Sequence, residues 1–347
     1  MRLLIVGTGG MASQHALSFA AIAGVKLVGG VDVERARVDA FAAKYKMAKA
    51  FTSLDEAIAW GKFDAAANVT PDSAHHPTTM ALLKAGKHVF CEKPLAENYP
   101  KALEMTEAAE TAGLVNMVNL TYRNVAQLQK ARAMVLAGEI GEVRHVEAAY
   151  LQSWLVSKLW GDWKTESKWL WRLSKSHGSN GALGDIGIHI VDFAVHGSGQ
   201  NIDQVFCRLK TFDKVRGNRI GDYGLDANDG FSMSVRFANG ALGVVHASRF
   251  ATGHINDLRL RVHGTKGAVE VFHRLDGSTL RACLGGDIEK GLWTDVACDA
   301  VETNYQRFAK AVKAGKTLEP SFRHATGMQK ILDQAMVSDA CQRDLSV

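Results

Sequence analysis

The sequence predicts an α/β protein in which a doubly wound parallel sheet precedes an α+β domain with a large, mainly antiparallel, open-faced sheet. Up to about residue 120, short apolar runs alternate with amphipathic helical patterns, which indicates βαβ units. Beyond residue 230, apolar and polar residues alternate with a period of two, as half-buried strands do. We therefore expect one domain over 1–121 and a second over 122–347.

Strands and helices alternate along the first predicted domain. The predicted strands are 3–6, 26–31, 65–69, 88–91 and 115–120, and the predicted helices are 11–23, 34–45, 54–60, 77–85 and 99–112. Ser53 and Glu56 predict a capping box, while Gly86 and Gly113 stand where helices end. Right-handed crossovers then give a parallel sheet whose strands all point the same way.

The second predicted domain opens with a helix over 125–137 and continues with long strands. The strands at 231–237 and 241–250 are joined by a hairpin turn at Asn239-Gly240. Helices near 300–314 and 322–342 close the chain, and the last helix is a candidate to pack back on the first domain.

Composition excludes several classes of function. The formal charge of +5 is spread along the chain, which gives no electrostatic footprint for nucleic acid. No apolar stretch reaches membrane-spanning length, and the first apolar run is too short for a signal peptide. The five cysteines are odd in number and lack C-x-x-C spacing, which predicts reduced thiols in a cytoplasmic protein and no zinc or other metal site.

The stretch Gly7-Thr8-Gly9-Gly10-Met11-Ala12 follows the first predicted strand and opens the first helix. In that context it is a Rossmann fingerprint: Gly7 permits the tight turn and Gly9 lets the main chain approach a pyrophosphate. The phosphates then meet the positive end of the helix dipole. The domain over 1–121 is therefore predicted to bind a dinucleotide.

Asp32 ends the second strand, where an acidic residue receives the adenosine ribose hydroxyls. Its carboxylate favours NAD because it repels a 2′-phosphate. Arg35 and Arg37 are close enough in sequence to pair with that phosphate, so NADP stays open. Asp32 is also compatible with a simple N-cap.

Two further strand ends carry candidate cofactor residues. Thr70 and Pro71, with His75 shortly after, leave the strand at 65–69 on the rim where ligands of such sheets bind. Glu92 and Lys93 leave the next strand at the same edge. Lys93 is a candidate for proton transfer and for contact with the substrate.

Asp185 and His189 lie four residues apart, so on a helix both side chains emerge from one face. The apolar stripe Ile186, Ile190 and Phe193 supports that helix. Taken singly, Asp185 is explained as a helix cap and His189 as a core histidine. The functional interpretation of the pair is strengthened by the presence of Lys93 and of the glycine turn that is predicted to bind the nucleotide.

Over nearly its full length the chain resembles the Gfo/Idh/MocA oxidoreductases. The matching stretches are the fingerprint at 7–12, Thr70-Pro71 with His75, 87–96, Tyr122-Arg123-Asn124, 138–143, Asp185-x-Gly187-x-His189 and 264–267. The resemblance implies that Lys93, Asp185 and His189 match the catalytic lysine, aspartate and histidine of the family. It also implies a sugar or cyclitol substrate, NAD(P) as cofactor, and Tyr122 and Arg123 as candidates for substrate contact.

Five of the seven tryptophans fall between residues 154 and 171, interleaved with lysines and Arg172. As a pocket wall, Trp154, Trp163 and Trp171 offer ring faces to a sugar, and Arg172 offers hydrogen bonds. A subunit contact explains the same composition, because aromatic residues and arginine are enriched at interfaces. The sequence leaves both interpretations open.

The resulting hypothesis is an enzyme that transfers a hydride between NAD(P) and a secondary alcohol or hemiacetal carbon of a sugar or cyclitol. His189 takes the hydroxyl proton, Lys93 hydrogen-bonds the reacting oxygen, and Asp185 anchors the substrate. One alternative is an NAD-dependent enzyme that cleaves glycosides by oxidation and elimination. Another is a non-catalytic NAD-sensing regulator. A homodimer or homotetramer is expected, because a large sheet face is left open.

Overall fold

The computed structural model describes residues 1–347, which form two compact units. The first unit comprises Met1–Thr121 with Glu302–Gln329, and the second comprises Tyr122–Val301 with Lys330–Val347. A segment near the C-terminus thus belongs to the same unit as the N-terminal strands. None of the helices combines the length and apolar character that a membrane crossing requires.

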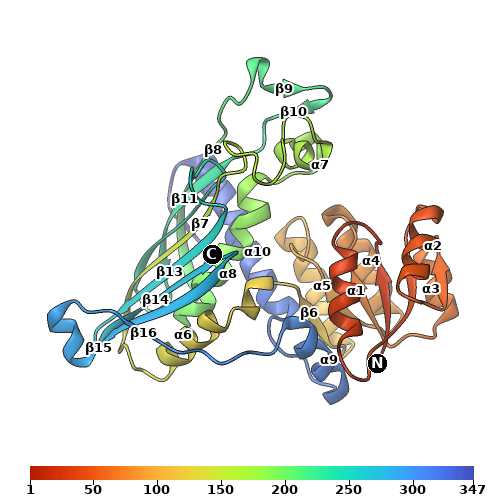
Figure 1. Ribbon diagram of the computed structural model, residues 1–347, viewed down its shortest axis with the longest axis horizontal. Helices are drawn as coiled ribbons and strands as arrows, with labels where there is room; N and C mark the ends of the chain where they lie inside the picture. The colour runs from red at the N-terminus through yellow and green to blue at the C-terminus, as the bar shows by residue number, and fades with distance from the viewer. The chain divides into compact units, whose positions relative to one another are not determined.

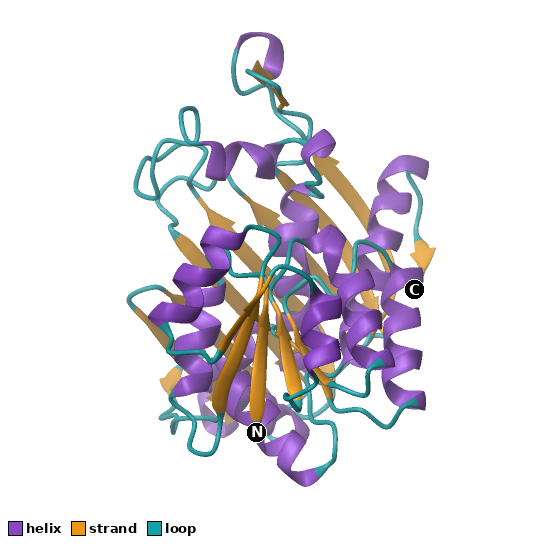
Figure 2. Cartoon of the chain, turned by 90° about the vertical axis from the view of Figure 1, so that its right-hand side faces the viewer, coloured by secondary structure: helices purple, strands orange, loops and turns teal.

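A six-stranded parallel sheet in the order β3-β2-β1-β4-β5-β6 forms the centre of the first unit. Its strands are β1 (Arg2–Val6), β2 (Lys26–Val31), β3 (Lys49–Phe51), β4 (Ala65–Asn68), β5 (His88–Cys91) and β6 (Asn116–Val118). Its helices are α1 (Ala12–Ala20), α2 (Arg35–Lys44), α3 (Leu54–Trp60), α4 (Asp72–Lys84), α5 (Tyr99–Thr111) and α9 (Asn304–Ala314). Helices stand on both sides of the parallel strands (Figure 2). The predicted doubly wound sheet is confirmed, and its strand order reverses between β1 and β4, where such sheets bind ligands.

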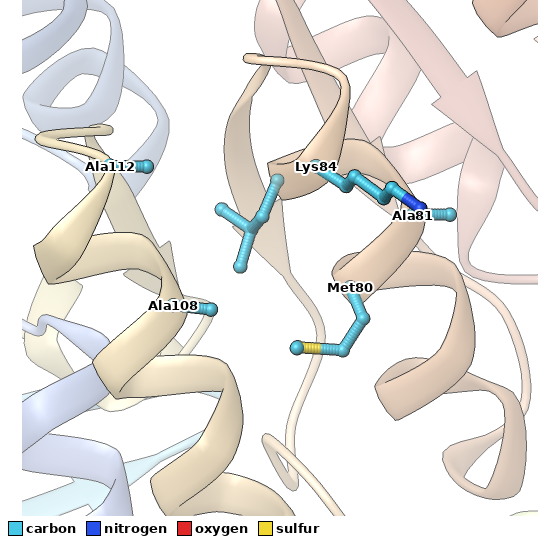
Figure 3. Close-up of a pocket in the computed structure, with 6 residues that line it drawn as sticks. Met80, Ala81, Lys84, Ala108 and Ala112 are labelled. Atoms are coloured by element: carbon cyan, nitrogen blue, oxygen red, sulfur yellow. The ribbon is translucent and has the colours of Figure 1, made fainter.

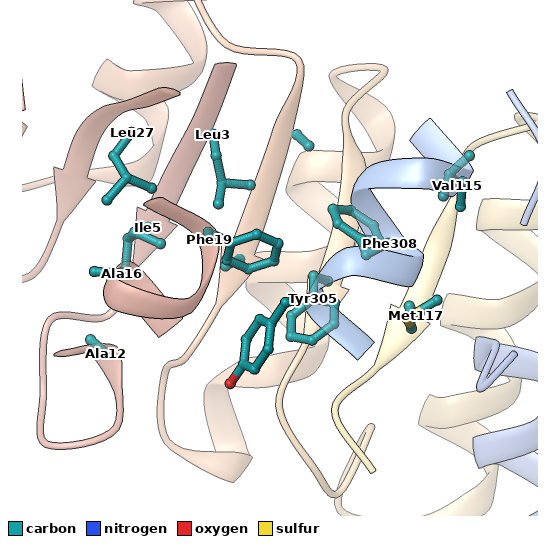
Figure 4. Close-up of a cluster of buried hydrophobic side chains, with 14 of the residues drawn as sticks. Leu3, Ile5, Ala12, Ala16, Phe19, Leu27, Val115, Met117, Tyr305 and Phe308 are labelled. Carbon is teal, nitrogen blue, oxygen red and sulfur yellow. The ribbon is translucent and has the colours of Figure 1, made fainter. Parts of the chain in front are cut away.

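Aromatic packing fixes α9 against the first unit's sheet (Figure 4). Phe19 of α1 meets Tyr305 of α9 edge to face at 5.0 Å between ring centroids, and Phe90 of β5 lies 5.3 Å from Phe308. Each such pair stabilises the fold by about 0.5–1.5 kcal/mol beyond the burial of its area. The C-terminal segment is therefore an integral part of this core.

The second unit is built on a nine-stranded sheet in the order β16-β15-β14-β13-β7-β12-β11-β8-β17. Neighbouring strands are antiparallel except for the parallel pair β7 and β12, which confirms the predicted mainly antiparallel sheet. Its strands are β7 (Val143–Gln152), β8 (Ile202–Lys210), β11 (Gly230–Phe237), β12 (Leu242–Ser248), β13 (Asn256–Gly264), β14 (Gly267–Arg274), β15 (Gly277–Leu284), β16 (Thr294–Asp295) and β17 (Leu345–Ser346). A short hairpin of β9 (Arg219–Ile220) and β10 (Tyr223–Gly224) stands apart from it.

Helices α6 (Ala126–Leu136) and α8 (Ile188–Ser198) pack on one face of the nine-stranded sheet (Figure 1). The side chains that alternate with the buried ones, such as Leu242 and Val244 of β12, are 60% and 40% exposed. One sheet face is thus covered within the chain and the other is open. The remaining helices are α7 (Ser167–Leu170) and α10 (Phe322–Cys341), and α10 contributes residues to both units.

Three local predictions differ from the structure. Strand β3 was not predicted, because only three residues of it pair. Helix α4 begins at Asp72, whereas the prediction began it at Pro77. Pro77 lies inside the helix because its missing N–H costs only one hydrogen bond, and Asp72 favours the earlier start because an acidic residue stabilises the first turn. The predicted capping box is wrong, since Ser53 accepts from the Asp55 N–H and not from that of Glu56.

Candidate functional site

The glycine turn after β1 is shaped for a close ligand. Gly7 has a φ of +86°, and a Cβ there would lie 2.6 Å from the carbonyl oxygen of Val69, so only glycine fits. At Gly9 and Gly10, by contrast, a Cβ would meet no protein atom within 4 Å. Packing within the chain does not require those two glycines, and the open space at Gly9 suits the close approach of a pyrophosphate.

Helix α1 begins directly after this turn. Met11 occupies the N-cap position, but its side chain makes no capping hydrogen bond, and the first turn contains no acidic residue. No side chain of the helix's own first turn therefore neutralises the N-terminal N–H groups or the positive end of the helix dipole, which suits this end of α1 to an anion. The residues present fit a dinucleotide.

The carboxylate of Asp32 is fixed beside the turn. Its Oδ2 accepts hydrogen bonds from the Thr8 N–H at 2.9 Å and the Thr8 hydroxyl at 2.8 Å. Its Oδ1 accepts from the Glu34 N–H at 3.1 Å and from Arg37 at 3.1 Å. Burial alone would raise the pKa of Asp32, but the bonds from Thr8 and Glu34 outweigh it and lower the pKa. Asp32 is thus an oriented anion, and Arg37 is already paired with it.

The turn after β4 depends on a buried amide that the sequence did not single out. Asn68 is fully buried; its Oδ1 accepts from the Thr70 hydroxyl at 2.7 Å. Its Nδ2 donates to the hydroxyls of Thr78 and Thr79 in α4 at 2.7 and 2.9 Å. His75, predicted to contact the cofactor, is also fully buried beneath this turn. Asn68 therefore ties Thr70 to the first two turns of α4.

Glu92 fixes the main chain that leads into Lys93. Its carboxylate accepts from His15 Nε2 at 2.7 Å, from Asn119 Nδ2 at 2.7 Å and from the Lys93 N–H at 3.1 Å. Burial alone would raise the pKa of Glu92, but the His15 and Asn119 bonds lower it to about 2. Glu92 thus supports the backbone of Lys93 and is itself held by groups distant in sequence, while its predicted contact with the cofactor stays a prediction.

In the second unit, Asp185 and His189 lie on one continuous helical run. Leu183–Gly187 form a π-helical turn and Ile188 begins α8, so the predicted helix carries a wide turn at Asp185. Such turns are frequent at functional sites because they re-aim side chains. Asn228 holds the start of this run, since its Oδ1 accepts from the Leu183 N–H at 2.9 Å.

Asp185 is anchored by a buried arginine that the sequence did not predict. Arg249 is fully buried and donates from Nη2 to Asp185 Oδ2 at 2.9 Å and from Nη1 to the Arg172 carbonyl at 3.1 Å. Its guanidinium also lies 5.1 Å from the ring centroid of Trp154. In the sequence, Arg249 could have been singled out by its position directly after the apolar strand β12. Arg172, a predicted substrate contact, lies 3.8 Å from Asp185.

Hydroxyl groups gather beside His189. The Tyr122 ring meets the His189 imidazole edge to face at 5.0 Å, and the Tyr122 and Tyr150 hydroxyls are 2.5 Å apart. Asn256 accepts from the Tyr150 hydroxyl at 2.7 Å and donates to that of Tyr122 at 2.9 Å. Burial, Tyr122 and the charge of Asp185 raise the pKa of Tyr150 well above its usual value, so it remains a neutral phenol.

Three expected substrate residues lie in the interior. Arg123 forms a buried bidentate ion pair with Asp192, with nitrogen–oxygen distances of 2.7 and 2.6 Å. Trp154 and Trp163 are only 3% and 5% exposed and belong to an apolar cluster. Trp171, at 36% exposed, offers a ring to solvent. Of these four residues, only Trp171 is exposed to solvent, and the substrate contacts of all four stay predictions.

An apolar pocket of about 550 Å³ lies elsewhere, between α4 and α5 (Figure 3). Met80, Ala81, Leu83 and Lys84 of α4 line it together with Ala108 of α5 and Ala112 directly after α5, and Met80 points toward α5. Lys84 is its only charged residue, so it has no acid–base pair and no phosphate cradle. This pocket carries none of the chemistry described above.

The parallel sheet, the glycine turn and the oriented Asp32 define an NAD-binding oxidoreductase. Residues 1–120 match the model of the oxidoreductase family with an NAD-binding Rossmann fold, and residues 128–270 match the GFO/IDH/MocA C-terminal domain. The chain belongs to the Gfo/Idh/MocA family of oxidoreductases, which confirms the resemblance seen in the sequence.

Curated relatives include a levoglucosan dehydrogenase from Pseudarthrobacter phenanthrenivorans, 29% identical over 79% of this chain and 77% of the relative. A myo-inositol 2-dehydrogenase from Thermotoga maritima is 27% identical over 78% of this chain and 74% of that protein. Among solved structures, a levoglucosan dehydrogenase complexed with NADH and L-sorbose shares the fold, with a TM-score of 0.86 and 24% identity over 100% of this chain and 98% of the other.

Proposed function

We propose that this protein transfers a hydride between NAD and a secondary alcohol or hemiacetal carbon of a sugar or cyclitol. Lys93, Asp185 and His189 are the proposed catalytic residues. The observation that carries the proposal is that each stands on a fixed piece of backbone. Glu92 accepts from the Lys93 N–H, and Arg249 and Asn228 hold the helical run of Asp185 and His189. Relatives named as levoglucosan, myo-inositol and 1,5-anhydro-D-fructose enzymes support this substrate class.

In the proposed mechanism the protein supplies orientation and proton transfer. Bound NAD supplies the acceptor for the hydride. Gly7, Gly9 and the start of α1 hold its phosphates, and Asp32 receives the adenosine ribose hydroxyls. Thr70, Pro71 and the neighbouring turn after β5 lie at the sheet edge proposed for the nicotinamide half.

On the substrate side, His189 takes the proton from the reacting hydroxyl, and Lys93 hydrogen-bonds the same oxygen and shares the proton transfer. Asp185 accepts from a neighbouring substrate hydroxyl while Arg249 holds its carboxylate in place. Tyr122 presents a hydroxyl and a ring edge beside His189. We propose that Lys93, Asp185 and His189 all contact the same substrate molecule.

We infer NAD as the preferred cofactor over NADP. Asp32 is an ionised carboxylate bound by Thr8, and Arg37 is engaged by Asp32 and Glu34 rather than directed to a phosphate. A 2′-phosphate would have to displace that pairing and approach a like charge.

We further propose a homodimer or homotetramer in a reducing, cytoplasmic setting. The open face of the nine-stranded sheet, with Leu242 and Val244 exposed, supports association of copies. All five cysteines are unpaired in the structure, which fits reduced thiols.

The test is a panel of polyols, aldoses, cyclitols and glycosides, assayed for NADH absorbance with NAD and with NADP. The proposal expects NADH to form with at least one sugar or cyclitol. Release of free sugar from a glycoside without net NADH would favour cleavage by oxidation and elimination. NAD binding with no turnover on any substrate would favour a sensing role.

A further inference from the structure

The buried ring of His75 has two partners that can only accept hydrogen bonds. Nδ1 lies 2.7 Å from the carbonyl oxygen of Pro94, and Nε2 lies 2.9 Å from that of Thr70. A neutral imidazole carries one N–H and can donate only one hydrogen bond, whereas the imidazolium carries two. Both contacts are hydrogen bonds only if the ring is charged.

We propose that His75 is held as a buried imidazolium that clamps the turn after β4 to the turn after β5. It is a positioning residue: it donates to Thr70 in one turn and to Pro94 in the other, and so fixes the distance between Thr70 and the residue next to Pro94, Lys93. Its consequence for turnover rests on the proposed function, whereas its charge state does not.

The surroundings of the ring favour the charged form. His75 is fully buried, and burial by itself lowers its pKa. Cys91 of β5, Asp72 at the start of α4 and the Pro94 carbonyl more than offset that, and raise the pKa of His75 to about 9. Asp72 shares α4 with His75, whereas Cys91 and the Pro94 carbonyl come from β5 and the turn after it.

The clamp completes a set of bonds around Thr70. Asn68 at the end of β4 accepts from the Thr70 hydroxyl at 2.7 Å and donates to the His75 carbonyl at 3.2 Å. The Thr70 side chain is therefore held by β4, and its carbonyl is held by His75. A neutral ring would release one of the two turns, because it must give up either Thr70 or Pro94.

The charge state is tested on the unaltered protein by NMR of a sample with 15N-labelled histidine. We expect both ring nitrogens of His75 to be protonated at pH 7 and to remain so until about pH 9. The signal is assigned by the contacts of the ring to Thr70 and Pro94, which needs no variant. A single protonated ring nitrogen at pH 7 would overturn the proposal.

The clamp is tested with His75→Gln, which places a neutral amide in the same pocket, and with His76→Gln as the control. His76 is the next residue of α4 and pairs with Glu104 instead. We expect H75Q to weaken NADH binding or lower turnover by up to roughly 10²-fold, the cost of a displaced contact of about 1 Å. H76Q should behave as the unaltered protein.

A purely structural role would lower affinity equally at every pH. The clamp instead predicts that the NADH affinity of the unaltered protein falls as pH passes about 9, and that H75Q shows no such fall. NADH binding by H75Q with unchanged affinity and an unchanged pH profile would contradict the clamp. Failure of the whole substrate panel, with the NADH results intact, would contradict only the dehydrogenase proposal.

Discussion

The strand-end turns of the first unit and the tryptophan-rich segment 154–171 of the second are held in different ways. In the turns, buried Asn68, His75 and Glu92 fix the main chain through directional hydrogen bonds. In the segment, rings pack on one another, as Trp154 stacks on Trp169 at 5.5 Å, while the lysines between them are exposed. Directional bonds suit hydride transfer, which depends on fixed geometry. Apolar packing with exposed polar ends suits a surface that selects the substrate or a partner.

The largest effect is expected at the turn after β5. Replacing Lys93 with methionine should lower turnover by roughly 10²–10⁴ because acid–base transfer is lost, while NADH still binds. Stopped-flow assays with the best substrate of the panel, together with NADH titration, measure both quantities. The control is Lys84→Met on the exposed end of α4. Unchanged turnover in K93M would remove Lys93 from the mechanism.

A substitution of Glu92 tests whether the charge that supports the same turn contributes to the free energy of unfolding. Its pKa of about 2 lies below the ordinary value of 4.5, so its contribution is complete above about pH 4.5 and is lost as the pH falls through 2. Glu92→Gln should therefore reduce the free energy of unfolding at pH 7 by up to about 3 kcal/mol.

Urea unfolding at several pH values checks this, and the gap between E92Q and the unaltered protein should close as the pH is lowered towards 2. Glu110→Gln, which breaks an exposed pair with Arg323, serves as the control and should change stability little. A gap that stays constant with pH would show that the charge of Glu92 is not what stabilises the turn.

Asp32 tests cofactor choice. Asp32→Ser removes the like charge that faces a 2′-phosphate and releases Arg37 to pair with it. The ratio of kcat/KM for NADP to that for NAD should rise at least roughly tenfold, since like-charge contacts cost several kcal/mol. Steady-state kinetics with both cofactors measure it. If the ratio stayed fixed, Asp32 would not be the discriminating group.

The smallest effect is expected in the tryptophan-rich segment. Trp171→Ala should change stability within about 0.5 kcal/mol because the ring is at the surface. If Trp171 forms part of the pocket wall, loss of its ring should raise the KM for the sugar by about 2- to 10-fold, which is the value of one aromatic contact. Leu159→Ala, at a 72% exposed position of the same segment, is the control.

A change in sedimentation of W171A without a change in KM would instead make this segment a subunit contact. Either outcome sharpens the contrast with the turns, where the K93M effect is on turnover alone.

The sequence pointed to those parts of the candidate site that a local pattern encodes. Gly7 and Asp32 follow from the spacing of a βαβ unit, and Asp185 with His189 follows from helical periodicity. Their supports did not follow, because they come from distant positions: His15 and Asn119 reach Glu92, and Arg249 reaches Asp185.

Burial was the other property that spacing does not reveal. Trp154 and Trp171 carry the same ring, yet one is 3% and the other 36% exposed. Arg123 resembles a ligand contact in the sequence, and only the fold shows its pairing with Asp192. The wide turn at Asp185 likewise depends on packing around Asn228 and not on helix propensity.

The central proposal is that Lys93 and His189 both act on one reacting hydroxyl beside bound NAD. The most direct measurement is a crystal structure of the protein with NADH and the substrate found in the panel. We expect Lys93 Nζ and His189 within about 3.2 Å of the same substrate oxygen, with Asp185 on a neighbouring hydroxyl. A substrate bound away from either group would contradict the account.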